Sequence, residues 1–247
     1  MMPPSNDSPL VPSNVPVGLV PSSGSKILIA GTGRCGTTAL IQFLTRLGLD
    51  TGLEERNGQW FTTFYQHATE DANGMPTHVN RKPPPGWKGG SCFNTSMRAG
   101  CEAAIAPDDD PAVIARLPRV LKNPRFTTTL ATLLSRRILQ VEHVLVPIRD
   151  LGAVTASKWN AGIKPPVPRW YHKDEEILRA ESARQLGELV TTLNMYHVPH
   201  TYLRFPEFVR SPVYLQHQLL AAIPEARDTQ LFMRAYAATF KPEWVHH

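Results

Sequence analysis

The sequence has little of what marks secreted, membrane-spanning or nucleic-acid-binding proteins. It holds three cysteines in 247 residues, an odd number that does not indicate a disulfide framework. No apolar run is long enough to span a bilayer, and the start of the chain lacks the basic residues and apolar core of a secretory signal. Lys and Arg are scattered, although the net charge is +5, whereas a nucleic-acid footprint would be denser. We therefore expect a cytoplasmic protein with no membrane span and no nucleic-acid partner.

What the chain does contain is typical of one α/β domain. With 42% hydrophobic and 19% charged residues, residues 25–247 suffice for a single sizeable core. Residues 1–24 are rich in Pro and Ser and hold no basic residue, so we expect a disordered N-terminal segment. Clusters of Pro and Gly between about 50 and 118 predict a loop-rich insert within the domain.

Short apolar runs alternate with helical patterns along the rest of the chain. Strands are predicted near 26–30, 119–122, 143–148 and 200–204, and helices near 37–47, 127–138, 151–159, 174–194, 212–222 and 228–239. This alternation favours a three-layer α/β fold, in which helices flank a central, mostly parallel sheet.

The most informative stretch is Lys26–Thr38, an apolar strand that leads through Gly31, Gly33 and Gly36 into a helix. Such a turn aims backbone N–H groups and a positive helix end at one point, which is typical of a phosphate site. The alternative is a tight turn without a ligand, but a turn that also carries an arginine and two threonines is costly as mere scaffold.

Two known ligand classes fit the glycines only in part. A P-loop kinase pattern is met at Gly31, Gly36 and Thr38, but Thr37 stands where the lysine that reaches the β- and γ-phosphates belongs. A dinucleotide-binding pattern is met at the three glycines, but it needs a second apolar strand about 20 residues on that ends in an acid. Residues 48–58 are instead predicted to form a loop.

A second segment separates these alternatives. The predicted strand 143–148 ends in Arg149–Asp150, and Ser157 follows Arg149 by eight residues, inside the next helix. Taken alone, Arg149 and Asp150 would be interpreted as a surface ion pair. With the glycine loop, Arg149 and Ser157 resemble the pair with which sulfotransferases grip the 3′-phosphate of their donor, 3′-phosphoadenosine 5′-phosphosulfate (PAPS).

The glycine loop also resembles that family, and specifically its bacterial and carbohydrate-type branches, because Arg34 and a small residue precede Gly-Thr-Thr. Cys35 stands where the family usually has serine, so that a thiol in the loop predicts sensitivity to oxidation. Two weaker resemblances follow: Val120–Phe126, with Asn123 in place of an acid, and Tyr202–Phe208. Together these elements cover the chain from about Lys26 to about Ile223.

The resemblance implies a P-loop-type fold and transfer of a sulfuryl group from PAPS to a hydroxyl or amine of a small-molecule, glycan or lipid acceptor, without a metal. It implies that the donor is bound by Arg34, Cys35, Gly36, Thr37, Thr38, Arg149 and Ser157. Arg34 would also stabilise charge during transfer, with help from Lys122 or Arg125. The loop-rich insert would shape the acceptor pocket.

The general base is the least specific part of the pattern. Gly52-Leu-Glu-Glu followed by Trp60 resembles a Gly-His-Glu…Trp stretch of bacterial sulfotransferases, which makes Glu54 the predicted base. Glu55, His67 and His78 stay as alternatives, because Leu53 replaces the family's histidine. Trp60, Phe61 and Phe64 have the spacing of one buried helical face.

Two other classes of function stay open at this point. A small-molecule or nucleotide kinase with an altered P-loop would require Mg²⁺ and would not distinguish a 3′-phosphorylated adenosine from ADP. A nucleotide-binding regulatory module would bind adenosine 3′,5′-bisphosphate without turnover. The sequence leaves the acceptor, the oligomeric state and a bond between Cys92 and Cys101 open.

Overall fold

In a computed structural model, residues 24–56, 59–62, 105, 111–115, 117–160 and 174–240 are described. The elements are β1 Lys26–Ile29, α1 Thr37–Arg46, β2 Leu53–Arg56, β3 Gln59–Thr62, α3 Pro111–Ala115, β4 Val120–Lys122, α4 Phe126–Ser135, β5 Val141–Ile148, α5 Leu151–Asn160, α6 Asp174–Met195, β6 His200–Arg204, α7 Glu207–Arg210, α8 Pro212–Leu219, η2 Pro224–Arg227 and α9 Thr229–Thr239. Within these ranges, no helix is both long and apolar enough to cross a membrane.

The main sheet has four strands, which are all parallel and lie in the order β4-β1-β5-β6. Leu28 of β1 pairs with Leu121 of β4 on one side and with Val144 of β5 on the other. β1 is buried along its whole length and Val144–Pro147 of β5 is apolar and buried, as expected where helices cover both faces of a sheet.

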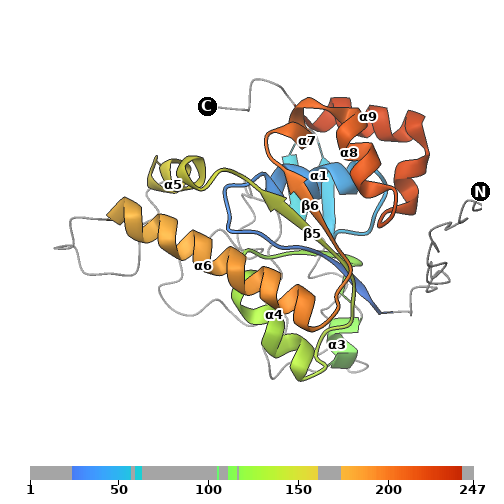
Figure 1. The fold of residues 1–247 in the computed structure, drawn as a ribbon. Coiled ribbons are helices and arrows are strands. Elements are labelled where there is room, and N and C mark those ends of the chain that lie inside the picture. Colours follow the sequence, from blue (N-terminus) through green and yellow to red (C-terminus); the bar gives the residue numbers. More distant parts are fainter. Residues whose placement is uncertain are drawn as a thin grey trace, which may run out of the picture.

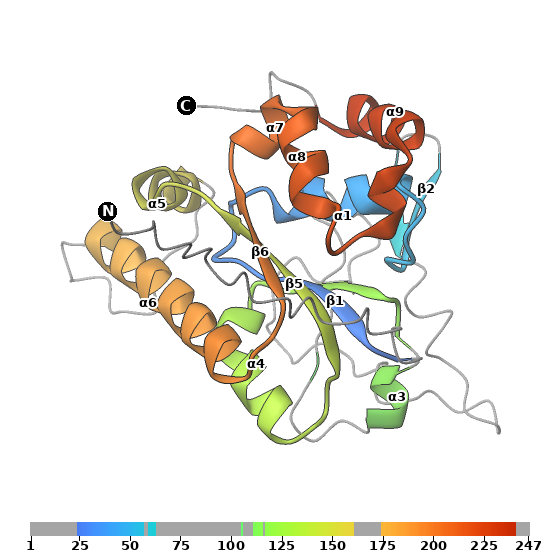
Figure 2. The ribbon, with the colours of Figure 1, turned by 45° about the vertical axis from the view of Figure 1, so that its right-hand side comes forward.

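One layer of helices lies on each face of the sheet, as Figure 1 and Figure 2 show from two directions. α1 and α9 pack together on one face (Figure 2). Phe43 of α1 contacts Phe232 and Phe240 there, at centroid distances of 5.1 and 5.4 Å. α4 and α6 pack together on the opposite face, and α5 packs against α6. The predicted three-layer α/β architecture is therefore confirmed, and its sheet is entirely parallel.

The main strands and helices lie where the sequence predicts them, but the segment after α1 does not. Residues 48–58 were expected to be a loop, whereas β2 pairs with β3 as an antiparallel hairpin outside the main sheet. The predicted helical face through Trp60 and Phe61 is also wrong, because both lie in β3. Trp60 packs against the core beneath the Arg46 guanidinium, 5.0 Å from the ring centroid.

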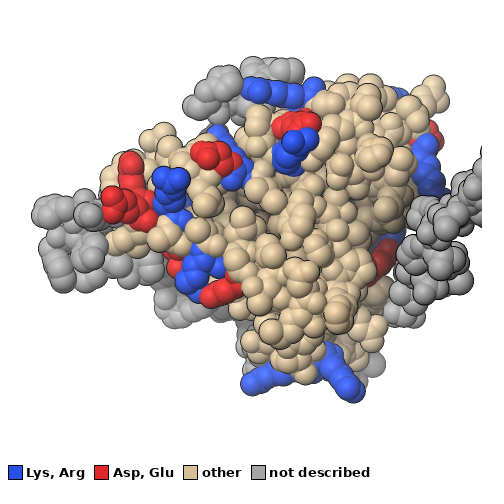
Figure 3. Space-filling model, viewed as in Figure 1, with Lys and Arg blue, Asp and Glu red and all other residues tan. Residues whose placement is uncertain are grey.

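Several sequence predictions concern residues outside the described ranges. These include the N-terminal segment up to residue 23, most of the insert, Phe64, His67, His78, Cys92 and Cys101. On the face shown in Figure 3, Lys and Arg lie interspersed with Asp and Glu around a broad area of other residues, rather than in one continuous patch.

Candidate anion-binding site

The two sequence motifs lie at the carboxyl edge of the parallel sheet. The chain leaves β1 toward α1 on one face of the sheet, whereas it leaves β4 toward α4 on the other face. In open α/β sheets, ligands bind outside the strand ends at such a change of direction. The loop between β1 and α1 therefore occupies the position where this architecture forms a crevice.

The loop backbone takes left-handed conformations at three of its residues. Gly33, Arg34 and Gly36 have φ values of +74°, +59° and +86°. Arg34 is not a glycine, and a left-handed side-chain-bearing residue costs about 1 kcal/mol or more. Strain of this kind clusters at functional positions, although Arg137 and His197, which follow helices α4 and α6, have similar φ values in this chain.

Close packing explains two of the glycines. A Cβ atom on Gly31 would lie 2.8 Å from the Cys35 Sγ atom. On Gly36, it would lie 2.7 Å from Phe208 and 2.9 Å from Phe205. Gly36 is also the N-cap residue of α1, and it has no side chain with which to cap that helix.

The structure brings together the two motifs that the sequence keeps more than 100 residues apart. The Arg34 Nε atom donates a hydrogen bond of 3.1 Å to the Ser157 hydroxyl. Arg149 in turn donates one of 3.1 Å to the backbone carbonyl of Arg34. Arg34, Arg149 and Ser157 therefore form one cluster, as the predicted donor site requires.

The cluster concentrates positive charge. Burial lowers the pKa of Arg149, and the neighbouring Arg34 charge lowers it further. The Arg149 guanidinium also lies over the Phe205 ring, 4.8 Å from its centroid. Phe205 thus links the segment after β6 to both the arginine cluster and Gly36. Two guanidinium groups this close favour a bound anion, which would relieve their repulsion.

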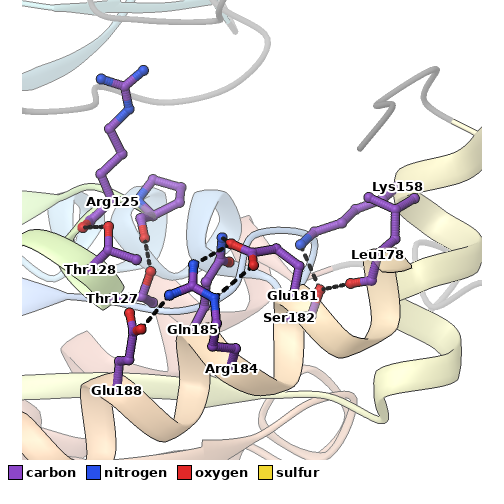
Figure 4. A network of polar contacts seen from close by, with 11 residues as sticks. Arg125, Thr127, Thr128, Lys158, Leu178, Glu181, Ser182, Arg184, Gln185 and Glu188 are labelled. Atoms are coloured by element: carbon purple, nitrogen blue, oxygen red, sulfur yellow. Dashed lines mark hydrogen bonds and ion pairs between the residues drawn. The ribbon is translucent and has the colours of Figure 1, made fainter. Parts of the chain in front are cut away.

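A lysine completes the other side of the loop. Lys122, at the end of β4, is 2% exposed, and its Nζ atom lies 3.5 Å from the Thr38 hydroxyl. The adjacent Asn123 accepts a hydrogen bond of 2.8 Å from the Arg125 amide, and so shapes the turn into α4. In Figure 4 the Arg125 side chain extends away from that helix.

Cys35 is in the loop, as predicted, but its thiol is completely buried. Burial raises the pKa of this thiol to about 11, although backbone hydrogen bonds and the charges of Lys158 and Lys122 act in the opposite direction. A buried thiol with a raised pKa is poor in thiolate. This environment therefore disfavours the predicted oxidation sensitivity of Cys35.

The predicted base lies in the β2–β3 hairpin. Its neighbour Glu55 forms an ion pair of 2.7 Å with Arg46, the last residue of α1. Because α1 rises about 1.5 Å per residue, that contact lies about 14 Å along the helix from Thr37. Glu55 thus has a structural partner, and the catalytic role of Glu54 stays a prediction.

Sequence reasoning missed one residue near the loop. Lys158, on α5, is 8% exposed and donates a hydrogen bond of 2.8 Å to Ser182 on α6 (Figure 4). Against the larger effect of burial, the Lys158 charge lowers the pKa of the Cys35 thiol, which indicates that the two side chains lie near each other. The only signal in the sequence is a lysine directly after Ser157, which a scattered surface lysine would also give.

The described residues contain no group of three or more His, Cys, Asp or Glu that could hold a metal ion. No family model matches the chain, and neither a curated protein nor a solved structure matches it significantly. The function must therefore be inferred from the geometry of the site.

Proposed function

We propose that this protein is a sulfotransferase that transfers a sulfuryl group from PAPS to a hydroxyl or amine acceptor. The observation that carries the proposal is the contact between the glycine loop and the second motif, in which Arg34 bonds to Ser157 and Arg149 bonds to Arg34. A donor with a phosphate at each end of one nucleoside fits a site with two adjoining sets of anion-binding groups.

Each part of the site then has a role. Arg34 and the amides of Gly36–Thr38 would bind the 5′-phosphosulfate, with Cys35 packed beneath them, while Arg149 and Ser157 would bind the 3′-phosphate. The acceptor oxygen attacks sulfur in line, its proton passes to Glu54, and the bond from sulfur to the 5′-phosphate oxygen breaks. Lys122 and Arg34 would stabilise the negative charge that develops on that oxygen.

One observation weighs against the kinase alternative. In P-loop kinases the hydroxyl at the position of Thr38 binds Mg²⁺, but here the Lys122 ammonium lies against it. Thr37, which replaces the phosphate-binding lysine, is 5% exposed. A regulatory module that binds adenosine 3′,5′-bisphosphate without turnover is the second candidate, because it uses the same cation cluster and does not need Glu54.

The first experiment is calorimetry without metal, which compares adenosine 3′,5′-bisphosphate with ADP and NAD. We expect micromolar binding of the bisphosphate, at least about tenfold tighter than the other two, a difference of about 1.4 kcal/mol. Tighter binding of ADP or NAD would overturn the proposal. Given the expected selectivity, turnover of PAPS with a panel of sugar, lipid, phenol and peptide acceptors distinguishes the enzyme from the module.

The cellular setting is part of the same proposal. We expect the protein to act in the cytoplasm on a small-molecule, glycan or lipid acceptor, without a nucleic-acid partner. A fluorescent fusion that localises to a membrane or an organelle would contradict the expected location without bearing on the donor site.

A further inference from the structure

Lys158 is a buried cation that none of the roles above uses. Its side chain leaves α5 toward α6, where it donates to the Ser182 hydroxyl at 2.8 Å. Ser182 is completely buried, and it donates its own hydroxyl proton to the Leu178 carbonyl at 2.7 Å. Ser182 must therefore accept from Lys158, so the ammonium is held by a neutral acceptor that leaves its charge in place.

Burying an ammonium costs free energy unless its charge is paired or used, so the partners of Lys158 are informative. Glu181 acts on Lys158 through its charge, but the Glu181 carboxylate is already bonded to Arg184 at 2.6 Å and to Gln185 at 2.8 Å. Figure 4 shows these three residues as a separate network along α6. The acid nearest to Lys158 is thus shared with another cation.

Lys158 adjoins the glycine loop along the chain, because the preceding Ser157 accepts the 3.1 Å hydrogen bond from Arg34. The charges of Lys158 and Lys122 both act on the completely buried Cys35 thiol of the loop, whose pKa burial raises and these charges lower. Lys122 ends β4 and Lys158 lies on α5, which follows β5, and β4 and β5 are the two strands that flank β1 in the sheet. Both ammonium groups therefore add positive potential at the loop, which would attract an anion bound by the loop amides.

We propose that Lys158 is a positioning residue of the donor site, which is held by Ser182 and strengthens binding of the 5′-phosphate end of the donor through its charge. This inference rests on the proposed function for the identity of the donor. It predicts that Lys158 acts at the loop, whereas Arg149 acts at the 3′-phosphate.

Two nucleotides distinguish the 5′-phosphate site at the loop from the 3′-phosphate site at Arg149. Adenosine 5′-phosphate offers only the 5′ group, and adenosine 3′,5′-bisphosphate offers both. We expect Lys158→Gln to weaken binding of both nucleotides by a similar factor of about tenfold, which is the effect of one charge roughly 12 Å from a phosphate at an effective dielectric near 20. We expect Arg149→Ala to weaken only the bisphosphate. Ser182→Ala keeps the lysine charge and should change neither affinity by more than about twofold.

Controls separate the charge from a loss of structure. Arg136→Gln removes one exposed positive charge at the C-terminal end of α4 and should leave both affinities unchanged. Thermal melting of every variant identifies losses caused by unfolding. If Lys158→Gln unfolds at too low a temperature for titration, Lys158→Met takes its place, because methionine keeps the apolar part of the side chain without the charge. Lys158→Arg keeps the charge and should retain wild-type affinity.

Specific results would overturn the inference. Nucleotide affinities of a folded Lys158→Gln variant within twofold of wild type would do so, as would a loss in Ser182→Ala equal to that in Lys158→Gln. Failure of wild type to prefer the bisphosphate over ADP would overturn the proposed function instead, while the adenosine 5′-phosphate titrations still test Lys158. Absence of any nucleotide binding by wild type would overturn both.

Discussion

Two groups of arginines, at opposite ends of the sheet, are held in different ways. At the amino ends of the strands, Arg119 bonds to Glu142 at 3.0 Å and to Glu225 at 2.9 Å. At the carboxyl ends, Arg34 bonds to a hydroxyl and Arg149 to a carbonyl. Burial lowers the pKa of Arg119, but its hydrogen bonds and the charges of both glutamates outweigh that effect and raise it, whereas the pKa of Arg149 is lowered.

This difference in partners and pKa indicates which cations are available to a ligand. A guanidinium matched by two carboxylates has its field cancelled and serves the fold. Around Arg149, burial and the Arg34 charge outweigh the Asp150 charge, which raises the pKa, so that the Arg34–Arg149 cluster keeps a net positive field. Substitutions in the Arg34–Arg149 cluster should therefore change ligand binding or turnover, and substitutions around Arg119 should change only stability.

The largest expected effect is on turnover. Glu54→Gln removes the predicted base and should lower kcat about 100-fold or more, with little change in bisphosphate affinity. Steady-state kinetics with a working acceptor, compared with Glu55→Gln as a matched neighbour, measures this. An unchanged kcat would assign the base elsewhere in the chain.

Arg149→Ala should weaken adenosine 3′,5′-bisphosphate binding about 10- to 100-fold, the usual value of a charge-assisted hydrogen bond. Calorimetry gives the donor affinity and kinetics gives the acceptor KM, which should change little. Equal losses for donor and acceptor would count against the assignment of Arg149 to the 3′-phosphate.

At the amino end, His143 should make stability depend on pH. Burial, and then the charge of His200, lower its folded-state pKa from 6.5 to about 4. Because the unfolded chain binds the extra proton first, this contribution to stability is complete above pH 6.5 and is lost as pH falls toward 4. Replacing His143 by Gln should reduce the loss over this window by about 2 kcal/mol. Urea unfolding of both proteins at several pH values tests this, and parallel curves would contradict it.

The ion-paired arginine gives a smaller effect. Glu142→Gln combined with Glu225→Gln leaves Arg119 half-buried without either carboxylate and should cost about 1–2 kcal/mol of unfolding free energy. Bisphosphate affinity should stay at the wild-type value. A clear loss of affinity in the folded double variant would break the distinction between the two ends.

The smallest effect concerns the left-handed loop residue. Arg34→Gly and Arg34→Ala both remove the guanidinium, but only glycine accepts φ of +59° without strain. We expect the glycine variant to be more stable than the alanine variant by about 1 kcal/mol, with equal losses in donor affinity. Chemical denaturation of the pair gives the difference, and an alanine variant of equal stability would show that the loop relaxes.

Sequence patterns predicted the sheet and its helices because the strands are short apolar runs buried on both faces, as in Val144–Val146. The proximity of Arg34 and Ser157 was also predictable, because both residues follow strands whose carboxyl ends meet at the same edge of the sheet. The β2–β3 hairpin was not, because Leu53–Arg56 is mostly charged and owes its pairing to neighbours such as Arg46. Lys158 was missed since burial of a lysine depends on tertiary packing.

The packing around Gly36 matters when this loop is compared among related sequences. The glycine contributes to every phosphate-binding pattern that the loop matches, yet two phenylalanines from the β6 end of the chain already forbid any larger residue there. Selection for packing alone would preserve it. Among proteins that share this architecture, an arginine at the position of Arg34 should therefore report retained nucleotide chemistry more faithfully than the glycine beside it.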